Sequence, residues 1–346
     1  MDNLNFVNLI QASIITTSIL GGILLWKSYE YRGLALLLAL SALASLINIL
    51  EETNITREIY LVSPVFIMLF GPATYLATKF MVYKRLNPYQ WLHLAPLIPF
   101  LLSTSYIKEV IALGTVWRLV YSVMTVLVLI QYKRQLDEQR SDSDEYSFHW
   151  LISIIAITSA FTIVDLVRLN SQHLISVQLN IFGQGFHNAI WLISMMAIIV
   201  ILTNHRQVPQ SITKNEQPQK PQQPLIKGHQ QQTEDEQQYR RIFIELDELI
   251  RANQWFLTPR LTLSDMSNFT GLQSREISRA INIHTQKSFN EYINDYRVEH
   301  FCQLLANQPK ASLTELSSQA GFSSKATFNK AFKQVKGCTP SEYKTK

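Results

Sequence analysis

The stretch from Gly321 to Lys344 reads GFSSKATFNKAFKQVKGCTPSEYK, and it decides the fold of the carboxy-terminal part of the chain. A short segment with leucines at helical spacing precedes Gly321, and a second helical segment runs from Ser324 to Val335. A glycine between two short helices permits the tight turn of a helix-turn-helix motif. The stretch therefore predicts one such motif, with residues 324–335 as its recognition helix.

The same pattern occurs once more, with its turn glycine at Gly271. Residues 261–282 read LTLSDMSNFTGLQSREISRAIN, in which Thr262 or Ser264 can cap a first helix, and a second helix is expected over residues 274–283. Residues 289–308 predict a long connecting helix that Pro309 stops. Two helix-turn-helix units joined in this way can reach successive major grooves, which lie about 34 Å apart.

A further amphipathic helix is expected just before the first unit. Residues 239–250 place six apolar side chains on one helical face. This face can complete the core of the domain, which we favour, or it can support contacts in a homodimer.

These motifs resemble the DNA-binding domain of AraC/XylS-type transcription regulators. The residues that match the family's signature are Gly321, Phe322, Phe328, Phe332, Lys333, Gly337 and the run Thr339–Tyr343. The resemblance covers residues 239–346 and implies binding to double-stranded promoter DNA and cooperation with RNA polymerase. It does not cover the first 200 residues, where family members usually carry a soluble sensing domain, although membrane-anchored members exist.

Helical periodicity separates core residues from candidate DNA contacts in both recognition helices. Ile277, Ile281, Phe328 and Phe332 fall on the inward faces. Arginine and lysine suit guanine or phosphate, asparagine suits adenine, and hydroxyl groups at a helix start suit phosphate. An arginine paired with Glu276 or left in solvent is the alternative for the first helix. The candidates for DNA binding are Arg275, Ser278, Arg279, Ser323, Ser324, Lys325, Thr327, Asn329, Lys330 and Lys333.

The first 204 residues have a different composition, dominated by apolar runs. About 20 mostly apolar residues suffice to span a bilayer. Runs that qualify lie near residues 6–26, 33–50, 59–83, 90–106, 111–132, 148–169 and 181–202. The fourth run is short and contains Pro96 and Pro99, so six spans with a re-entrant fourth segment is the alternative. The fold class predicted is all-α: a transmembrane bundle of about seven helices (1–204) and a soluble domain with two helix-turn-helix motifs (239–346).

Basic residues predict the orientation of this bundle, because they concentrate on the cytoplasmic side. With seven spans, one set of loops contains eight of them: Lys27, Arg32, Lys79, Lys84, Arg85, Lys133, Arg134 and Arg140. The opposite set contains Arg57, Lys108 and Arg168, with Arg118 inside a span near that side. This predicts an amino terminus outside and a DNA-binding domain in the cytoplasm. Together with the resemblance, it leads us to expect a multi-pass protein of a bacterial inner membrane. The first run is interpreted as a retained span.

Ionisable residues within spans are costly and therefore suggest a function. Those placed near the outer side are Glu51, Glu52, Arg118, Asp165, Arg168 and His187. Asp165 and Arg168 are three residues apart and can pair, while Gly183 and Gly185 permit close helix approach before His187. We expect an outward-facing pocket for an extracytoplasmic or membrane-soluble ligand, against the alternative of structural pairs.

Residues 205–238 are rich in glutamine and proline and predict a flexible linker. Cys302 and Cys338 have no metal-ligand spacing, and no enzyme motif or cofactor site is expected. Together these features predict a membrane-embedded one-component transcription regulator whose membrane domain anchors and senses. Two alternatives stay open: a receptor or transport protein with a regulatory tail, and an inert anchor that releases the DNA-binding domain by proteolysis.

Overall fold

The computed structural model describes residues 6–56, 61–102, 106–204 and 229–345. All elements named in these residues are helices, which confirms the all-α class. The chain divides into two compact units: Met1–Ile130 with Phe148–Ser211, and Gln131–Ser147 with Ile212–Lys346. Residues 131–147 thus group with the carboxy-terminal part, although the sequence analysis assigned them to the membrane domain.

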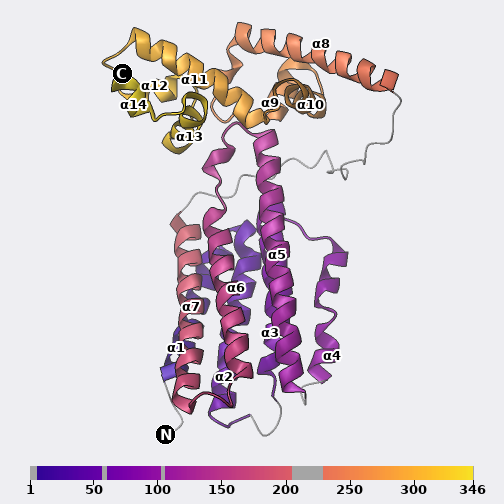
Figure 1. Cartoon of the computed structure of the whole chain (residues 1–346), viewed down its shortest axis with the longest axis vertical. Coiled ribbons are helices and arrows are strands. Elements are labelled where there is room, and N and C mark those ends of the chain that lie inside the picture. The colour runs from indigo at the N-terminus through magenta and orange to yellow at the C-terminus, as the bar shows by residue number, and fades with distance from the viewer. Residues whose placement is uncertain (1–5, 57–60, 103–105, 205–228, 346) are drawn as a thin grey trace. The chain divides into compact units, whose positions relative to one another are not determined.

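The first unit, which we call the membrane unit because its helices are predicted to span a membrane, is a bundle of antiparallel helices (Figure 1). Six helices in the described residues are long and apolar enough to cross a membrane. α1 packs against α2 and α7, α2 packs against α3, and α6 packs against α7. The elements are α1 (Phe6–Trp26), η1 (Tyr29–Tyr31), α2 (Arg32–Glu52), α3 (Ser63–Tyr83), η2 (Pro88–Leu94), α4 (Leu97–Leu102), α5 (Ile107–Gln139), α6 (His149–Asn170) and α7 (Val177–Asn204). Residues 131–139, at the end of α5, already belong to the second unit.

The fourth apolar run forms a broken segment. It consists of the 3-10 helix η2 and the short helix α4, and residues 103–105 lie outside the description. Pro96 and Pro99 explain the break, because proline lacks the amide donor that a continuous helix needs. In Figure 1 η2 and α4 lie at the edge of the bundle and run opposite to α3 and α5. Contacts of η2 and α4 with α3 hold the segment there.

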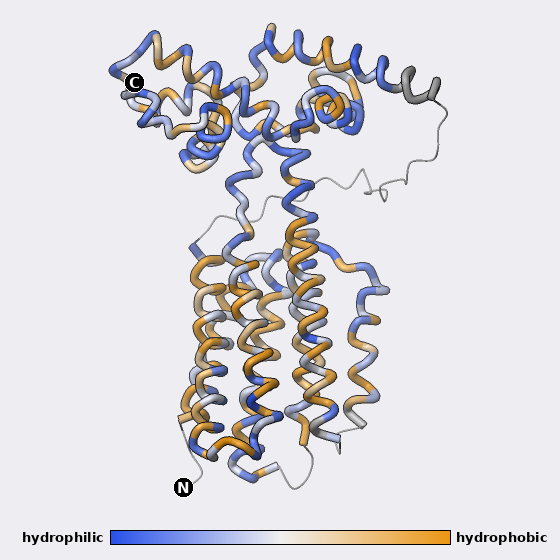
Figure 2. Tube along the Cα trace, in the orientation of Figure 1, coloured by the Kyte–Doolittle hydropathy of each residue, from blue (hydrophilic) through white to orange (hydrophobic). Residues whose placement is uncertain are grey.

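The membrane unit has an apolar surface and several polar groups inside. Figure 2 shows that apolar residues predominate along its helices. Leu9 is 71 % exposed and Ile193 62 % exposed, whereas Gln11 is 1 % exposed and Ser41 1 % exposed. A helix bundle in lipid can expose large apolar side chains and pack small or polar ones between its helices. This distribution supports the interpretation of the bundle as a membrane domain.

The second unit carries two helix-turn-helix motifs. The chain runs through α8 (His229–Asn253), η4 (Trp255–Leu257), α9 (Leu263–Thr270), α10 (Ser274–Thr285), α11 (Phe289–Asn307), α12 (Leu313–Gln319), α13 (Lys325–Lys336) and α14 (Pro340–Thr345). α11 is the predicted connecting helix. The helix α8 already begins at His229, so residues 229–238 are helical, whereas the remainder of the predicted linker, residues 205–228, lies outside the described residues.

Each motif has its own hydrophobic core, and α11 contributes to both. Ile293 of α11 packs with Leu246 of α8 and Ile277 of α10 in the first core. Phe301 of α11 packs with Phe328 and other apolar residues of α12 and α13 in the second. The amphipathic helix before the first motif therefore completes the domain core, as favoured from the sequence.

Local capping and a turn glycine define the motifs. Thr262, rather than Ser264, caps α9: its hydroxyl accepts a hydrogen bond from the amide of Asp265 at 3.1 Å. Gly321 has φ of +89°, and a Cβ there would lie 2.7 Å from the carbonyl oxygen of Phe256. Because both the backbone conformation and this close approach exclude a side chain, glycine is required at this turn.

Candidate nucleic-acid interface and membrane pocket

The recognition helix α13 has one buried face and one exposed face. Phe328, Ala331 and Phe332 are at most 5 % exposed, as the periodicity predicts. The exposed face carries four of the candidate DNA-binding residues: Lys325, Asn329, Lys330 and Lys333. These side chains give the helix three ammonium groups and one amide, a set that can bind phosphates and base edges.

The residues at the start of α13 have different roles. Ser323 and Ser324 are half-buried. Ser324 is the N-cap of α13, and its hydroxyl accepts a hydrogen bond from the amide of Thr327 at 3.2 Å. Thr327 is fully buried, and its hydroxyl lies 3.0 Å from that of Ser324. The placement of Thr327 on the outward face was therefore wrong, because the side chain belongs to the capping of its own helix.

The recognition helix of the first motif, α10, shows the same division. Ile277 and Ile281 are fully buried, whereas Arg275 and Arg279 are exposed and Ser278 is half-buried. The guanidinium of Arg279 lies over the ring of Tyr239, 4.8 Å from its centroid. Sequence reasoning assigned Tyr239 only to the apolar face of α8 and missed this contact. It holds the Arg279 side chain against α8 while leaving it exposed.

Three acidic side chains of residues 137–145 contact the candidate DNA-binding residues. Ser278 of α10 donates a hydrogen bond to Glu138 at 3.0 Å. Ser323 donates to Glu145 at 2.7 Å, and the ammonium of Lys330 lies 2.5 Å from a carboxylate oxygen of Asp144. Since Glu138 and Glu145 belong to one short segment, α10 and the start of α13 face the same side of the second unit.

Arg297 of α11 is the centre of a buried polar network. It is fully buried and donates hydrogen bonds to the carbonyl oxygens of Phe256 (2.7 Å) and Thr258 (2.8 Å). It also donates to Asn294 and to the hydroxyl of Ser141, both at 3.1 Å. Burial lowers the pKa of Arg297 to about 10, although nearby Asp142 opposes this effect. The guanidinium thus ties α11, η4 and residues 137–145 together.

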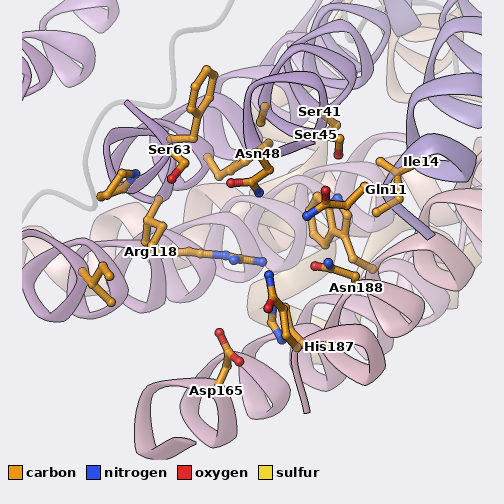
Figure 3. Close-up of a pocket in the computed structure, with 18 of the residues that line it drawn as sticks. Gln11, Ile14, Ser41, Ser45, Asn48, Ser63, Arg118, Asp165, His187 and Asn188 are labelled. Carbon is orange, nitrogen blue, oxygen red and sulfur yellow. The ribbon is translucent and has the colours of Figure 1, made fainter. Parts of the chain in front are cut away.

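The membrane unit contains a polar cavity of about 260 Å³ (Figure 3). Four of the predicted ligand-sensing residues line it: Arg118, Asp165, Arg168 and His187. Other polar residues that line the cavity were not predicted, although each is a polar interruption of an apolar run. They include Gln11, Ser41, Ser45, Asn48, Gln184 and Asn188.

Glu51 and Glu52 do not line the cavity. Glu51 is buried and accepts hydrogen bonds from the amides of Val62 (2.7 Å) and Ser63 (3.1 Å), so it satisfies donors at the start of α3. Glu52 accepts a hydrogen bond from Gln184, a lining residue, at 2.6 Å. This role of Glu51 depends on the end of α2 lying beside the start of α3, which the sequence alone does not show.

Asp165 and Arg168 form the predicted pair, with the guanidinium Nε 2.8 Å from the carboxylate. Gly183 allows this arrangement, because a Cβ there would lie 2.6 Å from Cδ of Arg168. Arg168 also donates to Asn180 of α7. The negative charge of Asp165 therefore has a cation beside it, and the pair joins α6 to α7.

Several groups of the cavity have no protein partner among the residues that the structure describes. Both polar atoms of the Gln11 side chain and Nδ1 of His187 are buried without a hydrogen bond. The guanidinium of Arg118 lies over the Trp191 ring, 5.2 Å from its centroid, and makes no ion pair within the described part of the chain. Figure 3 shows the Arg118 side chain extending toward His187. The cavity thus offers a cation and unused hydrogen-bonding groups.

Comparison with known proteins identifies the carboxy-terminal unit. Residues 266–346 match the family described as "Helix-turn-helix domain". The chain is 33 % identical over 85 residues to the uncharacterized HTH-type transcriptional regulator YdeC of Bacillus subtilis, covering 25 % of this chain and 29 % of YdeC. It is 33 % identical over 84 residues to the Msm operon regulatory protein of Streptococcus mutans, covering 24 % of this chain and 30 % of that protein.

An uncharacterized HTH-type transcriptional regulator of Staphylococcus aureus is 30 % identical over 84 residues, 24 % of this chain and 11 % of the relative. The chain therefore spans at most 30 % of the length of these three curated relatives. No solved structure matches. The carboxy-terminal domain of this protein is a helix-turn-helix domain of the AraC type, the kind found in transcriptional regulators.

Proposed function

We propose that the protein is a membrane-embedded, one-component transcription regulator that binds promoter DNA sequence-specifically through α10 and α13. One observation carries the proposal: both recognition helices turn polar side chains to the same side of the second unit, where residues 137–145 contact them. Two recognition helices on one side, joined by α11, are the arrangement needed to enter successive major grooves.

The side chains on this face divide by chemistry into base readers and phosphate contacts. Arg275 and Arg279 can donate two hydrogen bonds to a guanine, and Asn329 can pair with an adenine. Lys325, Lys330 and Lys333 supply positive charge for the phosphate backbone. Residues 274–346 contain 11 lysines and arginines and 6 acidic residues, so their net charge of +5 favours DNA.

A substitution in α10 tests base readout. Arg279→Ala should weaken binding to the specific site by about 1–3 kcal/mol and leave nonspecific DNA less affected. Crosslinking of the full-length protein to DNA across the genome first identifies the sites, with Arg279→Ala combined with Lys325→Ala as the mutant. Lys310→Ala is the matched control, because Lys310 is exposed after the end of α11. Promoter peaks that persist unchanged in the double mutant would contradict the assignment.

We place the membrane unit in a bacterial inner membrane with the second unit in the cytoplasm. The excess of lysine and arginine in one set of loops supports this orientation, and so does the need of the domain for DNA. Labelling of single cysteines in intact cells tests it: a cysteine replacing Ser171, between α6 and α7, should react with an impermeant maleimide. A cysteine replacing Ser147, between α5 and α6, should react only after lysis.

We further propose that the polar cavity of the membrane unit is the sensor and that its ligand is a small anion, such as a carboxylate. Asp165 is ion-paired with Arg168 and also interacts electrostatically with Arg118, whose guanidinium lies over the Trp191 ring and makes no ion pair of its own in the described residues. An anion would give Arg118 a charge partner, and Gln11 and His187 could complete its hydrogen bonds. A ligand-dependent change in self-association would then raise the local concentration of DNA-binding domains in a homodimer.

Two variants test the cavity at equal protein levels in the membrane. Arg118→Gln removes the proposed anion partner and should abolish the change in target-gene transcription between growth conditions. Asp165→Ala disrupts the pair with Arg168 and should weaken the same response. Lys79→Gln on α3, whose ammonium bonds the Tyr75 hydroxyl at 3.1 Å outside the cavity, is the control. A normal response in Arg118→Gln would exclude an anion sensor.

A further inference from the structure

The end of α5 and its connection to α6 are built into the DNA-binding unit. Residues 137–145, the acidic segment, read DEQRSDSDE and contain five carboxylates and one guanidinium. At their centre Ser141, Asp142 and Ser143 are fully buried. The amide of Ser141 donates to the carbonyl oxygen of Leu261 at 2.9 Å, and Arg140 and Thr262 form an isolated antiparallel bridge. A loop that was only passing over the surface would leave its backbone to water.

Both helix-turn-helix motifs and the helix between them bind this segment. Glu138 accepts from Ser278 of α10, and Glu145 accepts from Ser323 before α13. Asp144 pairs with Lys330 of α13 and accepts from Asn290 of α11 at 3.1 Å. The three acidic residues thus engage three of the ten candidate DNA-binding residues.

The other charged groups at the centre of the segment also have partners of opposite charge. The guanidinium of Arg140 holds the fully buried carboxylate of Asp142 with two hydrogen bonds, at 2.8 and 2.9 Å. Arg260 lies 3.8 Å from Asp142 and 3.7 Å from Glu145. Ser141 accepts from the buried Arg297. Because a buried charge is costly without partners, this complementarity indicates a specific docking site for the acidic segment.

The chemistry of these contacts is that of a phosphate backbone. A phosphate oxygen binds lysine and serine through the same charge-assisted hydrogen bonds that the carboxylates of residues 138, 144 and 145 accept here. A carboxylate 2.5 Å from Lys330 and another 2.7 Å from Ser323 engage hydrogen-bonding groups that a DNA phosphate could otherwise bind. The remaining negative charge would repel the duplex.

We infer that the acidic segment is an intrachain competitor of DNA and that the regulator binds DNA only when this segment leaves the recognition helices. The inference rests on the proposed function, since it assigns regulation to the same face. It also gives a covalent route for the signal. The segment lies in the chain between Arg118 of α5 and the pair Asp165 and Arg168 of α6, so two of the helices that line the cavity lead into its ends.

The test uses the full-length protein in lipid nanodiscs and a fluorescent 40-base-pair duplex of random sequence at fixed ionic strength. The triple variant Glu138→Gln, Asp144→Asn, Glu145→Gln keeps side-chain size and removes three charges. The control variant Glu245→Gln, Glu248→Gln, Glu299→Gln removes three charges from exposed positions of α8 and α11. If only the overall charge of the protein matters, both variants bind the duplex more tightly than the wild type, and by equal amounts. Competition predicts binding about tenfold tighter in the triple variant than in the control, because each charge-assisted hydrogen bond lost favours release.

Hydrogen exchange supplies the second measurement on the wild-type chain. Competition predicts that saturating duplex accelerates exchange of the Ser141 amide, which is bonded to Leu261 without DNA. Equal affinities of the two variants, with the Ser141 amide protected in the DNA complex, would make the segment a permanent part of the domain and overturn the inference while leaving DNA binding intact. Failure of every protein to bind any duplex would overturn the proposed function and the inference with it.

Discussion

Arg297 and Arg118 show how differently the two units treat an arginine drawn into their interior. Arg297 of the second unit donates to two backbone carbonyl groups, to Asn294 and to Ser141. Arg118 of the membrane unit has the Trp191 ring and no ion pair within the described residues. A guanidinium with its donors satisfied stabilises a fold, whereas one with unused donors is available to a ligand. The buried arginine of the second unit thus holds its fold together, whereas the arginine of the membrane unit keeps donors that the proposed ligand could use.

The largest effect is expected from the same substitution at both positions. Arg297→Met leaves several buried acceptors without a donor and should cost the second unit about 3–5 kcal/mol of unfolding free energy. Arg118→Met removes a charge that makes no ion pair in the described residues and leaves Asp165 paired with Arg168, so it should change the stability of the membrane unit by about 1 kcal/mol or less. Hydrogen exchange of the full-length protein follows the amides of α11 and α5 separately. Similar losses of stability in both units would contradict the claim that only Arg297 holds its unit together.

A substitution at Gly321 tests how strongly the stability of the second unit depends on its tight packing. Gly321→Ala introduces a Cβ 2.7 Å from the Phe256 carbonyl oxygen at a φ of +89°. The strain should cost about 2–3 kcal/mol and lower DNA affinity through the folded population. Gly271→Ala is the matched control, because Gly271 also has a positive φ but nothing within 4 Å of an added Cβ. Hydrogen exchange of the amides of α12 and α13 at increasing temperature compares the stability of the two variants. Equal losses of stability would show that the contact with Phe256 is unimportant.

The helices of the second unit follow from local patterns, and so they could be predicted. Leucine and isoleucine periodicity, Thr262 at a cap and Gly321 at a turn each act over a few residues. The polar lining of the cavity was predicted in part, because Arg118, Asp165 and His187 are conspicuous inside apolar runs. The roles of Glu51 and Glu145 could not be predicted, since each contacts backbone or side chains that are distant in sequence. Helical periodicity predicts the face of the helix on which a residue lies, but not the residue that it contacts.

Thr327 was predicted on the outward face of α13, but it is buried beside Ser324. A substitution there has the smallest expected effect. Thr327→Ser keeps the hydroxyl that lies beside Ser324 and removes one fully buried methyl group. Loss of a buried methyl costs about 1 kcal/mol, so the stability of the second unit should fall slightly. Base preference should not change, because the side chain does not reach the surface. Selection of bound duplexes from a random library measures this preference for both proteins. A loss of thymine preference at one position in Thr327→Ser would mean that the α13 N-terminus rearranges on DNA and that the buried methyl becomes a base contact.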